Sequence, residues 1–230
     1  MKRRFVAPAT KTVPTAYLTV DDAPSPELPA KLEILESAEV PALFFCEGRR
    51  LADYPEQARR AIEGGYHLGN HGYSHQHASE CSPETFRSEL ERTDALIDEV
   101  YEQAGVDRPA KLFRFPYGDK GDENAEEFQR ILESAGFVPP DPERIDYEWY
   151  RDCHTGDRDW FWTDDLEDWS LESRAELRER IESAANRLAS PSPDIVLFHD
   201  AGTASDLFAE LVGLLEERGV EFGAPLSLLP

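Results

Sequence analysis

Apolar residues follow two different spacings along the chain, and these spacings alternate. Residues 42–46 (Ala-Leu-Phe-Phe-Cys) and 195–198 (Ile-Val-Leu-Phe) are short continuous apolar runs, the pattern of strands buried on both faces. Leu28, Leu32 and Leu35 recur instead at helical spacing. The full pattern predicts strands at 16–20, 42–46, 66–69, 111–114, 137–138, 160–163, 195–198 and, near the end, 220–222. It predicts helices at 27–37, 55–63, 83–103, 123–134, 173–188 and 204–218.

This alternation of strands and helices, repeated about seven times, predicts an α/β fold. The sheet is expected to be parallel and covered by helices, either as a closed barrel or as an open doubly wound sheet. Neither G-x-G-x-x-G nor G-x-x-x-x-G-K-[ST] follows a predicted strand, so the nucleotide-binding versions lack their motif. No linker divides the 230 residues, and we expect one domain over 1–230. Residues 139–159 show no clear periodicity and predict no element.

The formal net charge of −23 is large for a chain of this size. Such a surface repels nucleic acid and anionic membranes, so neither is an expected partner. Acidic residues occur on nearly every predicted helix, which indicates a global adaptation rather than one binding patch. We interpret it as the surface of a protein that works in concentrated salt, where the Debye length falls to ~3 Å at 1 M and self-repulsion is screened.

Cysteine content and hydropathy both favour a cytoplasmic protein. Cys46, Cys81 and Cys153 are odd in number and form no C-x-x-C pair, so neither a disulfide framework nor a cysteine zinc site is expected. No apolar run approaches the ~20 residues of a membrane-spanning helix. The basic first residues are not followed by the apolar core of an export signal, because Lys11 and Pro14 interrupt it.

Candidate chemistry lies where the predicted strands end. Asp21 and Asp22 close the first strand, and His71 and His75 follow the third. Histidines four residues apart can reach one ion from a single helical turn, and an Asp completes a two-His, one-carboxylate set. Such a set leaves metal positions open for water and substrate, as hydrolysis requires. The remaining histidines of this region, His67 and His77, are expected to be structural or supporting.

Five short motifs, in order, resemble those of one known family. They are Thr19-Val20-Asp21-Asp22-Ala23-Pro24, His71-Gly72-Tyr73-Ser74-His75, Arg114-Phe115-Pro116-Tyr117-Gly118, Asp165-Leu166-Glu167-Asp168-Trp169 and Leu197-Phe198-His199-Asp200. The chain therefore resembles the polysaccharide deacetylases, the NodB-type carbohydrate esterase family 4. This resemblance implies a distorted (β/α)7 barrel, NodB-like, and metal-dependent removal of acetyl from an N-acetylated sugar.

The resemblance also implies a metal site and a general base. Asp22, His71 and His75 would hold a divalent metal, with Zn²⁺ the first choice and Co²⁺ or Mn²⁺ also suited to the ligands. Asp21 would be the base that takes a proton from water on that metal. Arg114 would keep Asp21 ionised and in place.

Further residues carried over from the resemblance would complete the chemistry. His199 would be the general acid for the departing amine, with Asp168 orienting its ring. The backbone N–H of Tyr117 would stabilise the oxyanion. Trp169 and Leu197 would line a pocket for the acetyl group.

Some residues depart from the family pattern. Gly72 stands where a Ser or Thr hydroxyl usually steadies the histidine loop, and Ser74 is a possible substitute. Ala23 and Val20 replace a usual Gly and a usual aromatic residue, which implies only a modest change of loop shape. Missing export signals favour a soluble small-molecule or oligosaccharide substrate. Two alternatives stay open, a ureido or cyclic-amide hydrolase on the same scaffold and a catalytically silent carbohydrate-binding homologue. No oligomeric state follows from the sequence.

Overall fold

The central strand of the fold is β1 (Thr15–Ala23), which carries the first motif. The structure, a computed structural model, describes residues 13–184, 188 and 193–230. The other strands are β2 (Ala42–Cys46), β3 (His67–Asn70), β4 (Asp164–Asp165), β5 (Asp194–His199) and β6 (Glu221–Phe222). All pairings are parallel, in the order β3-β2-β1-β5-β4, with β6 paired to β1. The carboxyl ends of these strands therefore meet at one edge of the sheet.

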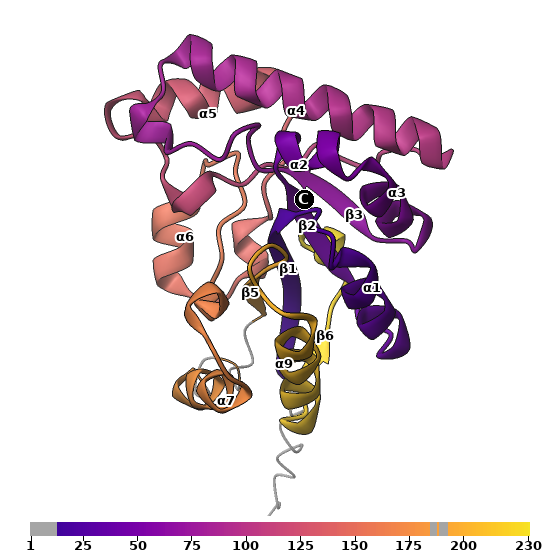
Figure 1. Cartoon of the computed structure of the whole chain (residues 1–230). Coiled ribbons are helices and arrows are strands. Elements are labelled where there is room, and N and C mark those ends of the chain that lie inside the picture. The colour runs from indigo at the N-terminus through magenta and orange to yellow at the C-terminus, as the bar shows by residue number, and fades with distance from the viewer. Residues whose placement is uncertain (1–12, 185–187, 189–192) are drawn as a thin grey trace, which may run out of the picture.

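Helices form an outer layer around the strands (Figure 1). They are α1 (Leu28–Ser37), α2 (Gly48–Asp53), α3 (Pro55–Glu63), α4 (Pro83–Ala104), α5 (Ala125–Ser134), α6 (Glu148–His154), α7 (Arg174–Ser183) and α9 (Ser205–Glu217). Contacts run from α7 to α9, α1, α3, α4 and α5 in turn. α6 lies on the β5 side of β1, between α5 and α7 in the view of Figure 1.

Strand periodicity separates the two sides of the sheet. On β2, Leu43 and Phe45 face the interior cluster, and Phe44 and Cys46 face the cluster beneath the helices. Both sides are buried, which is why this strand is apolar throughout. Gly69 of β3 has no room for a side chain, since a Cβ there would lie 2.6 Å from the Phe45 ring.

The sheet curves toward closure beyond β3 without a continuous ladder. Asn70 forms an isolated bridge with Phe113, and the backbone N–H of Trp160 donates to the carbonyl of Phe113 at 2.7 Å. The fold is therefore the expected parallel α/β, NodB-like barrel, with its sheet not fully closed. The strands predicted at 111–114 and 137–138 were wrong as regular strands, because these segments make only bridges with Asn70 and with each other. The strand predicted at 160–163 begins later, at Asp164.

Helix ends follow the local sequence. The Ser82 side chain accepts the N–H of Thr85 at the start of α4, and Gly105 ends this helix with φ of 69°. Ser173 caps α7 in the same way by accepting the N–H of Glu176. The predicted end of that helix, beyond Ala184, lies mostly outside the described residues. Helices α2 and α6 were not predicted.

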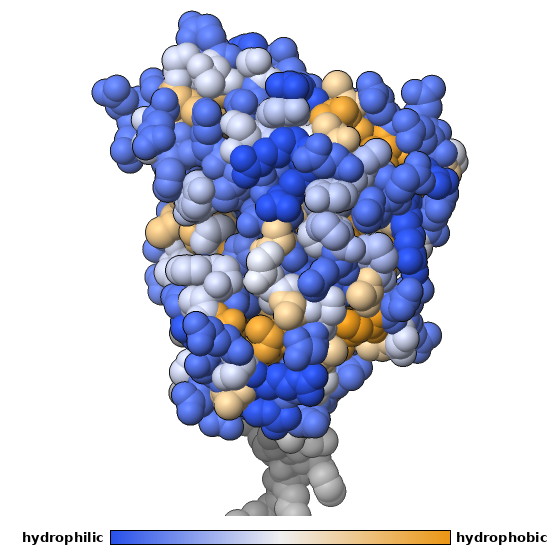
Figure 2. All heavy atoms as spheres, viewed as in Figure 1, coloured by the Kyte–Doolittle hydropathy of each residue, from blue (hydrophilic) through white to orange (hydrophobic). Residues whose placement is uncertain are grey.

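The molecular surface is mostly polar on the face shown in Figure 2, where hydrophobic residues form small separate patches. Among the residues that the structure describes, no helix is both long and apolar enough to cross a bilayer.

Candidate active site

A cavity of about 380 Å³ lies at the carboxyl ends of the strands. Its lining residues are Asp21, Asp22, His71, His75, Tyr117, Trp162, Asp165, Trp169, Leu197 and His199. Two more residues predicted from the motifs, Arg114 and Asp168, are buried behind this lining. The fold thus brings all the predicted site residues to one place, from segments up to 178 positions apart, as with Asp21 and His199.

Two adjacent carboxylates reach this cavity because β1 is irregular at its end. Neighbouring residues of a regular strand point to opposite faces. Asp21 keeps strand register opposite His199 of β5, but the register with β2 shifts between Val20 and Ala23. Asp22 has φ of 58°, a left-handed conformation that is uncommon outside glycine. The turn of the backbone at Asp22 brings its carboxylate to the same side as that of Asp21.

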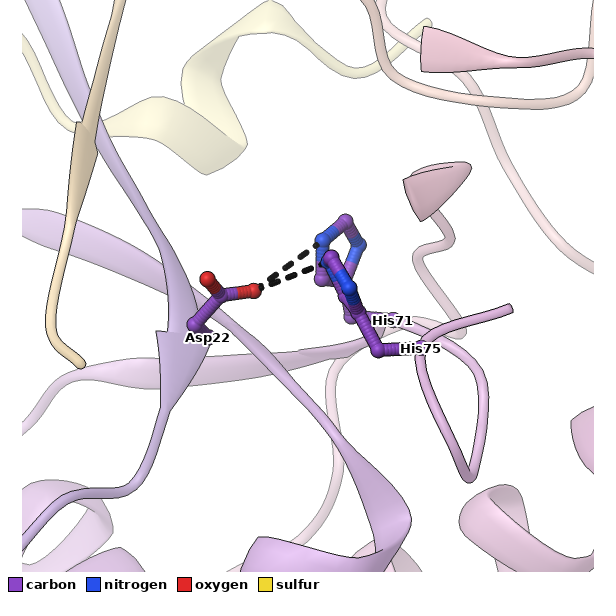
Figure 3. A group of neighbouring side chains, drawn as sticks. All are labelled: Asp22, His71 and His75. Atoms are coloured by element: carbon purple, nitrogen blue, oxygen red, sulfur yellow. Dashed lines mark ion pairs between the residues drawn. The ribbon is translucent and has the colours of Figure 1, made fainter. Parts of the chain in front are cut away.

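Asp22, His71 and His75 form a group suited to a metal ion. Their possible ligand atoms all lie within 4.8 Å of one another. Oδ1 of Asp22 lies 3.1 Å from Nε2 of His75 and 3.6 Å from Nε2 of His71 (Figure 3). This oxygen is buried and accepts no hydrogen bond from the described residues. An unsatisfied buried carboxylate oxygen beside two imidazoles fits a divalent cation.

The two histidines of this group differ in their hydrogen bonds and in the direction in which their pKa values are shifted. Nδ1–H of His71 donates to the carbonyl of Arg114 at 2.8 Å, which leaves Nε2 as the free nitrogen. Burial lowers the pKa of His71, so its ring stays neutral, as a metal ligand must be. Burial also acts to lower the pKa of His75, but the carboxylate of Asp22, with Oδ1 3.1 Å from Nε2 of His75, raises it overall. Burial opposes ionisation of Asp22, yet His75 and its other histidine neighbours keep the pKa of this carboxyl well below its usual range.

Arg114 is a cation buried in the barrel interior, with 1% of its surface exposed. Its Nη1 donates to Oδ1 of Asp21 and to the hydroxyl of Thr19, both at 2.8 Å. Its guanidinium lies over the ring of Phe45, 4.3 Å from the centroid. Thr19 and Asp21 are two residues apart on β1 and so face the same side. This arrangement supplies a positive charge to the buried carboxylate of Asp21.

His199 and Asp168 form a second polar pair, which reaches the cavity through the His199 ring. Nδ1 of His199 lies 2.7 Å from Oδ1 of Asp168, and the backbone N–H of His199 donates to Oδ2 at 2.9 Å. The hydroxyl of Thr203 also donates to Oδ2, at 2.5 Å. Burial lowers the pKa of His199, but the hydrogen bond and charge of Asp168 more than reverse this and raise it to about 9. His199 is therefore protonated at neutral pH.

Aromatic side chains surround the opening. Trp169 and Tyr117 are 64% and 58% exposed, although both are large and apolar. Tyr117 has φ of 60°, and its ring stacks on His77 with centroids 3.9 Å apart. Leu197 precedes His199 by two positions and so faces the same cavity. Of the histidines expected to be supporting, His77 fits that expectation through Tyr117, and His67 lies at the far end of β3.

Two lining residues were missed from the sequence, Trp162 and Asp165. Asp165 lies within the fourth motif, and burial raises the pKa of its carboxyl. The ring of Trp162 stacks on Phe161 with centroids 4.3 Å apart, and Phe161 stacks on His154 of α6 at 4.5 Å. The aperiodic segment 139–159 thus supports one wall of the cavity through α6. The one available signal was the fourth motif itself, which begins at Asp165.

Comparison with known proteins shows where this arrangement belongs. The sequence model of the polysaccharide deacetylase family matches residues 9–138. The chain belongs to the polysaccharide deacetylase family. Within this family it is similar to YheN of Bacillus subtilis (strain 168), named provisionally as a polysaccharide deacetylase, with 29% identity over 211 residues. It is also 36% identical over 107 residues to a chitooligosaccharide deacetylase of Rhizobium leguminosarum bv. phaseoli.

The share of each relative that the match covers limits which of its properties can be inferred for this chain. The YheN match covers 91% of this chain and 66% of YheN, and the rhizobial match covers 46% of this chain and 45% of its relative. The chain therefore spans only part of the length of both relatives. A solved structure with a TM-score of 0.70, at 24% identity, is a CE4 family pseudoenzyme from Bacillus anthracis, covered over 97% of this chain and 69% of the other. A shared fold does not establish catalysis, so the chemistry of this polysaccharide deacetylase homologue depends on the residues of its own site.

Proposed function

We propose that this polysaccharide deacetylase homologue is a metal-dependent hydrolase that removes acetyl from an N-acetylated sugar or a related amide. One observation supports the proposal: the ring of His199, whose pKa is raised to about 9, and the carboxylate of Asp21 line the same cavity as the three side chains proposed to hold the metal. Hydrolysis of an amide needs both a base for water and an acid for the amine, because the amine is a poor leaving group. A structural metal site would require neither His199 nor Asp21.

Asp22, His71 and His75 would hold the ion, with Zn²⁺ expected first and Co²⁺ or Mn²⁺ compatible with the same ligands. A bound ion would supply Lewis acidity toward the amide carbonyl and lower the pKa of a water ligand from 15.7 to about 7. Two imidazoles and one carboxylate leave coordination positions open for both. Asp22 raises the pKa of His75, so a bound cation would compete with a proton for this ring.

The protein side chains would manage the protons. Asp21, held by Arg114 at 2.8 Å, would accept the proton of the attacking water as the carbon–oxygen bond forms. His199, oriented by Asp168, would donate its proton to the nitrogen as the carbon–nitrogen bond breaks. The backbone N–H of Tyr117 would donate to the oxyanion. Acetate and a free amine are the products, with Trp169 and Leu197 around the acetyl methyl group.

The substrate class follows from the shape of the site. Exposed aromatic rings at an opening, with polar groups below, suit a sugar ring that presents one amide downward. We therefore infer that the substrate is a small or oligomeric N-acetylated sugar and that a single domain binds it. The acidic sequence and the free cysteines support the proposal that the protein works in a cytoplasm of high salt concentration.

Metal analysis of the purified protein and acetate release from a panel of N-acetyl sugars test the proposal. Asp22→Ala and His75→Ala are expected to lose metal and activity together. Asp21→Asn is expected to lose activity and keep the metal, because Asp21 lies outside the ligand set. Activity that survives complete chelation would refute the mechanism. Turnover of allantoin-like amides in place of sugars would favour the ureido reading, and metal without turnover on any amide would favour a silent homologue.

A further inference from the structure

The loop that carries both candidate metal-ligating histidines has an unusual backbone. It follows β3 and includes Gly72, with φ of 72°, and His75, with φ of 57°. A left-handed conformation is costly for histidine and persists only where the surroundings enforce it. The residues packed around the loop must therefore hold it in place.

Glu89 of α4 makes the contacts that such an anchor needs. Its Oε2 accepts the backbone N–H of Tyr73 at 3.1 Å and that of Ser74 at 2.7 Å. The same oxygen accepts the hydroxyl of Ser74 at 2.8 Å. Three donors thus converge on one half-buried carboxylate oxygen. Hydrogen bonds to a charged acceptor are roughly twice as strong as neutral ones.

The position of these bonds determines what they control. The peptide units of Tyr73 and Ser74 directly precede His75. Hydrogen bonds that hold these peptide units therefore also fix the backbone position from which the His75 ring extends. The first half of the loop is held separately, since Oδ1 of Asn70 accepts the N–H of Gly72 at 2.9 Å. The guanidinium of Arg92, three residues beyond Glu89 on α4, lies 3.4 Å from the centroid of the Tyr73 ring. Helix α4 therefore clamps the second half of the loop.

We propose that Glu89 is a positioning residue for the divalent cation, acting through the backbone before His75. Ser74 takes part in this anchor through its hydroxyl, which donates to the same carboxylate oxygen. The inference rests on the proposed metal site and identifies what keeps its third ligand in place. Glu89 touches neither the ion nor the substrate.

Metal binding by the full chain tests this directly. Metal-free protein is titrated with Co²⁺, with affinity from calorimetry and ligand geometry from the visible spectrum of the bound ion. Residues that orient metal ligands typically contribute about 10–100-fold in affinity, and we expect Glu89→Ala to weaken Co²⁺ binding by about that factor and to change the spectrum. Glu89→Gln keeps an oxygen acceptor and is expected to recover most of the loss. Glu91→Ala, an equal change of charge at an exposed position of the same helix, is the matched control and should bind as the native protein does.

The outcomes separate this inference from the proposed function. If native protein and His75→Ala bind Co²⁺ equally, the metal site itself is wrong and the proposed function fails with it. If His75→Ala loses binding while Glu89→Ala matches the native affinity and spectrum, only the role of Glu89 is overturned. Should Glu89→Ala fail to fold, Ser74→Ala decides instead. It removes one of the three donors, and we expect several-fold weaker binding with an unchanged melting temperature of the metal-free protein; native affinity in Ser74→Ala would then overturn the inference.

Discussion

Replacing Asp168 with Asn (D168N) keeps the shape of this side chain and removes the charge beside His199. Asp168 accepts the Nδ1–H and the backbone N–H of His199 at 2.7 and 2.9 Å. Burial lowers the pKa of His199, and Asp168 is the main influence that raises it to about 9. Burial is the largest single influence on this ring, and the attraction of Asp21 and Asp22 is weaker than that of Asp168. Without the Asp168 charge we therefore expect the pKa of His199 to fall at least to the ordinary histidine value of about 6.5.

The change in pKa gives a magnitude that depends on pH. A fall from about 9 to about 6.5 corresponds to about 3.4 kcal/mol, at 1.36 kcal/mol for each pKa unit. At pH 8 about nine-tenths of His199 is protonated in the native protein, against about 3% in D168N. The general acid is then depleted about 30-fold at pH 8 but only about 1.3-fold at pH 6. A bound cation opposes protonation in both proteins, so the measured quantity is their difference.

The assay is kcat/KM for acetate release between pH 6 and pH 10. We expect the basic limb of the profile to move down by about 2.5 pH units in D168N. Asp165→Asn is the control, because it removes a carboxylate from the same cavity that has no hydrogen bond to His199. We expect a smaller displacement of the basic limb in Asp165→Asn than in D168N. A loss in D168N that is equal at pH 6 and pH 8 would show that Asp168 orients the ring without setting its charge, and the reasoning would be wrong.

Two further predictions concern stability. Lys31→Met should lower the free energy of unfolding by about 3–5 kcal/mol in urea titrations, because it leaves the buried carboxylate of Asp200 without its cation, 2.9 Å away. Arg130→Met is the control, since its ion pair with Glu127 is exposed and should contribute at most about 1 kcal/mol; equal losses in both variants would contradict the argument. The melting temperature should rise from low salt to molar KCl, because a net charge of −23 repels itself less when screened. A melting temperature indifferent to salt would remove the basis for a high-salt origin.

The fold was predictable where one local rule decided each element. β2 matches its prediction at both ends because an uninterrupted apolar run suits only a strand covered on both faces. α4 was readable because Ser82 and Gly105 mark its ends. The segments 111–114 and 137–138 have strand-like composition, but the curving sheet allows them only single bridges. α6 was invisible because Tyr150 and the nearby Ile145 are buried through distant contacts, including one with Trp160, rather than by a helical stripe.

The candidate site, like the fold, was predictable from the sequence only in part. Resemblance in five motifs placed the residues that now lie together, although their catalytic roles remain predictions. Trp162 and Asp165 were missed because their entry into the cavity depends on where the sheet turns. Glu89 could not be found from the sequence either. It is one acidic residue among many on an amphipathic helix, and only the folded structure shows its carboxylate at the histidine loop.

The two adjacent aspartates at the end of β1 show how one type of side chain can face two different sets of partners. Asp21 continues the strand toward Arg114, and the left-handed backbone of Asp22 turns the second carboxylate toward the histidines. Their side chains are chemically identical, so what distinguishes them is the course of the backbone at the end of β1. A family member that needed to exchange the proposed roles of metal ligand and base could not do so by substitution here, since each residue is already an aspartate. Such a change would require an insertion, a deletion or a different course of the main chain.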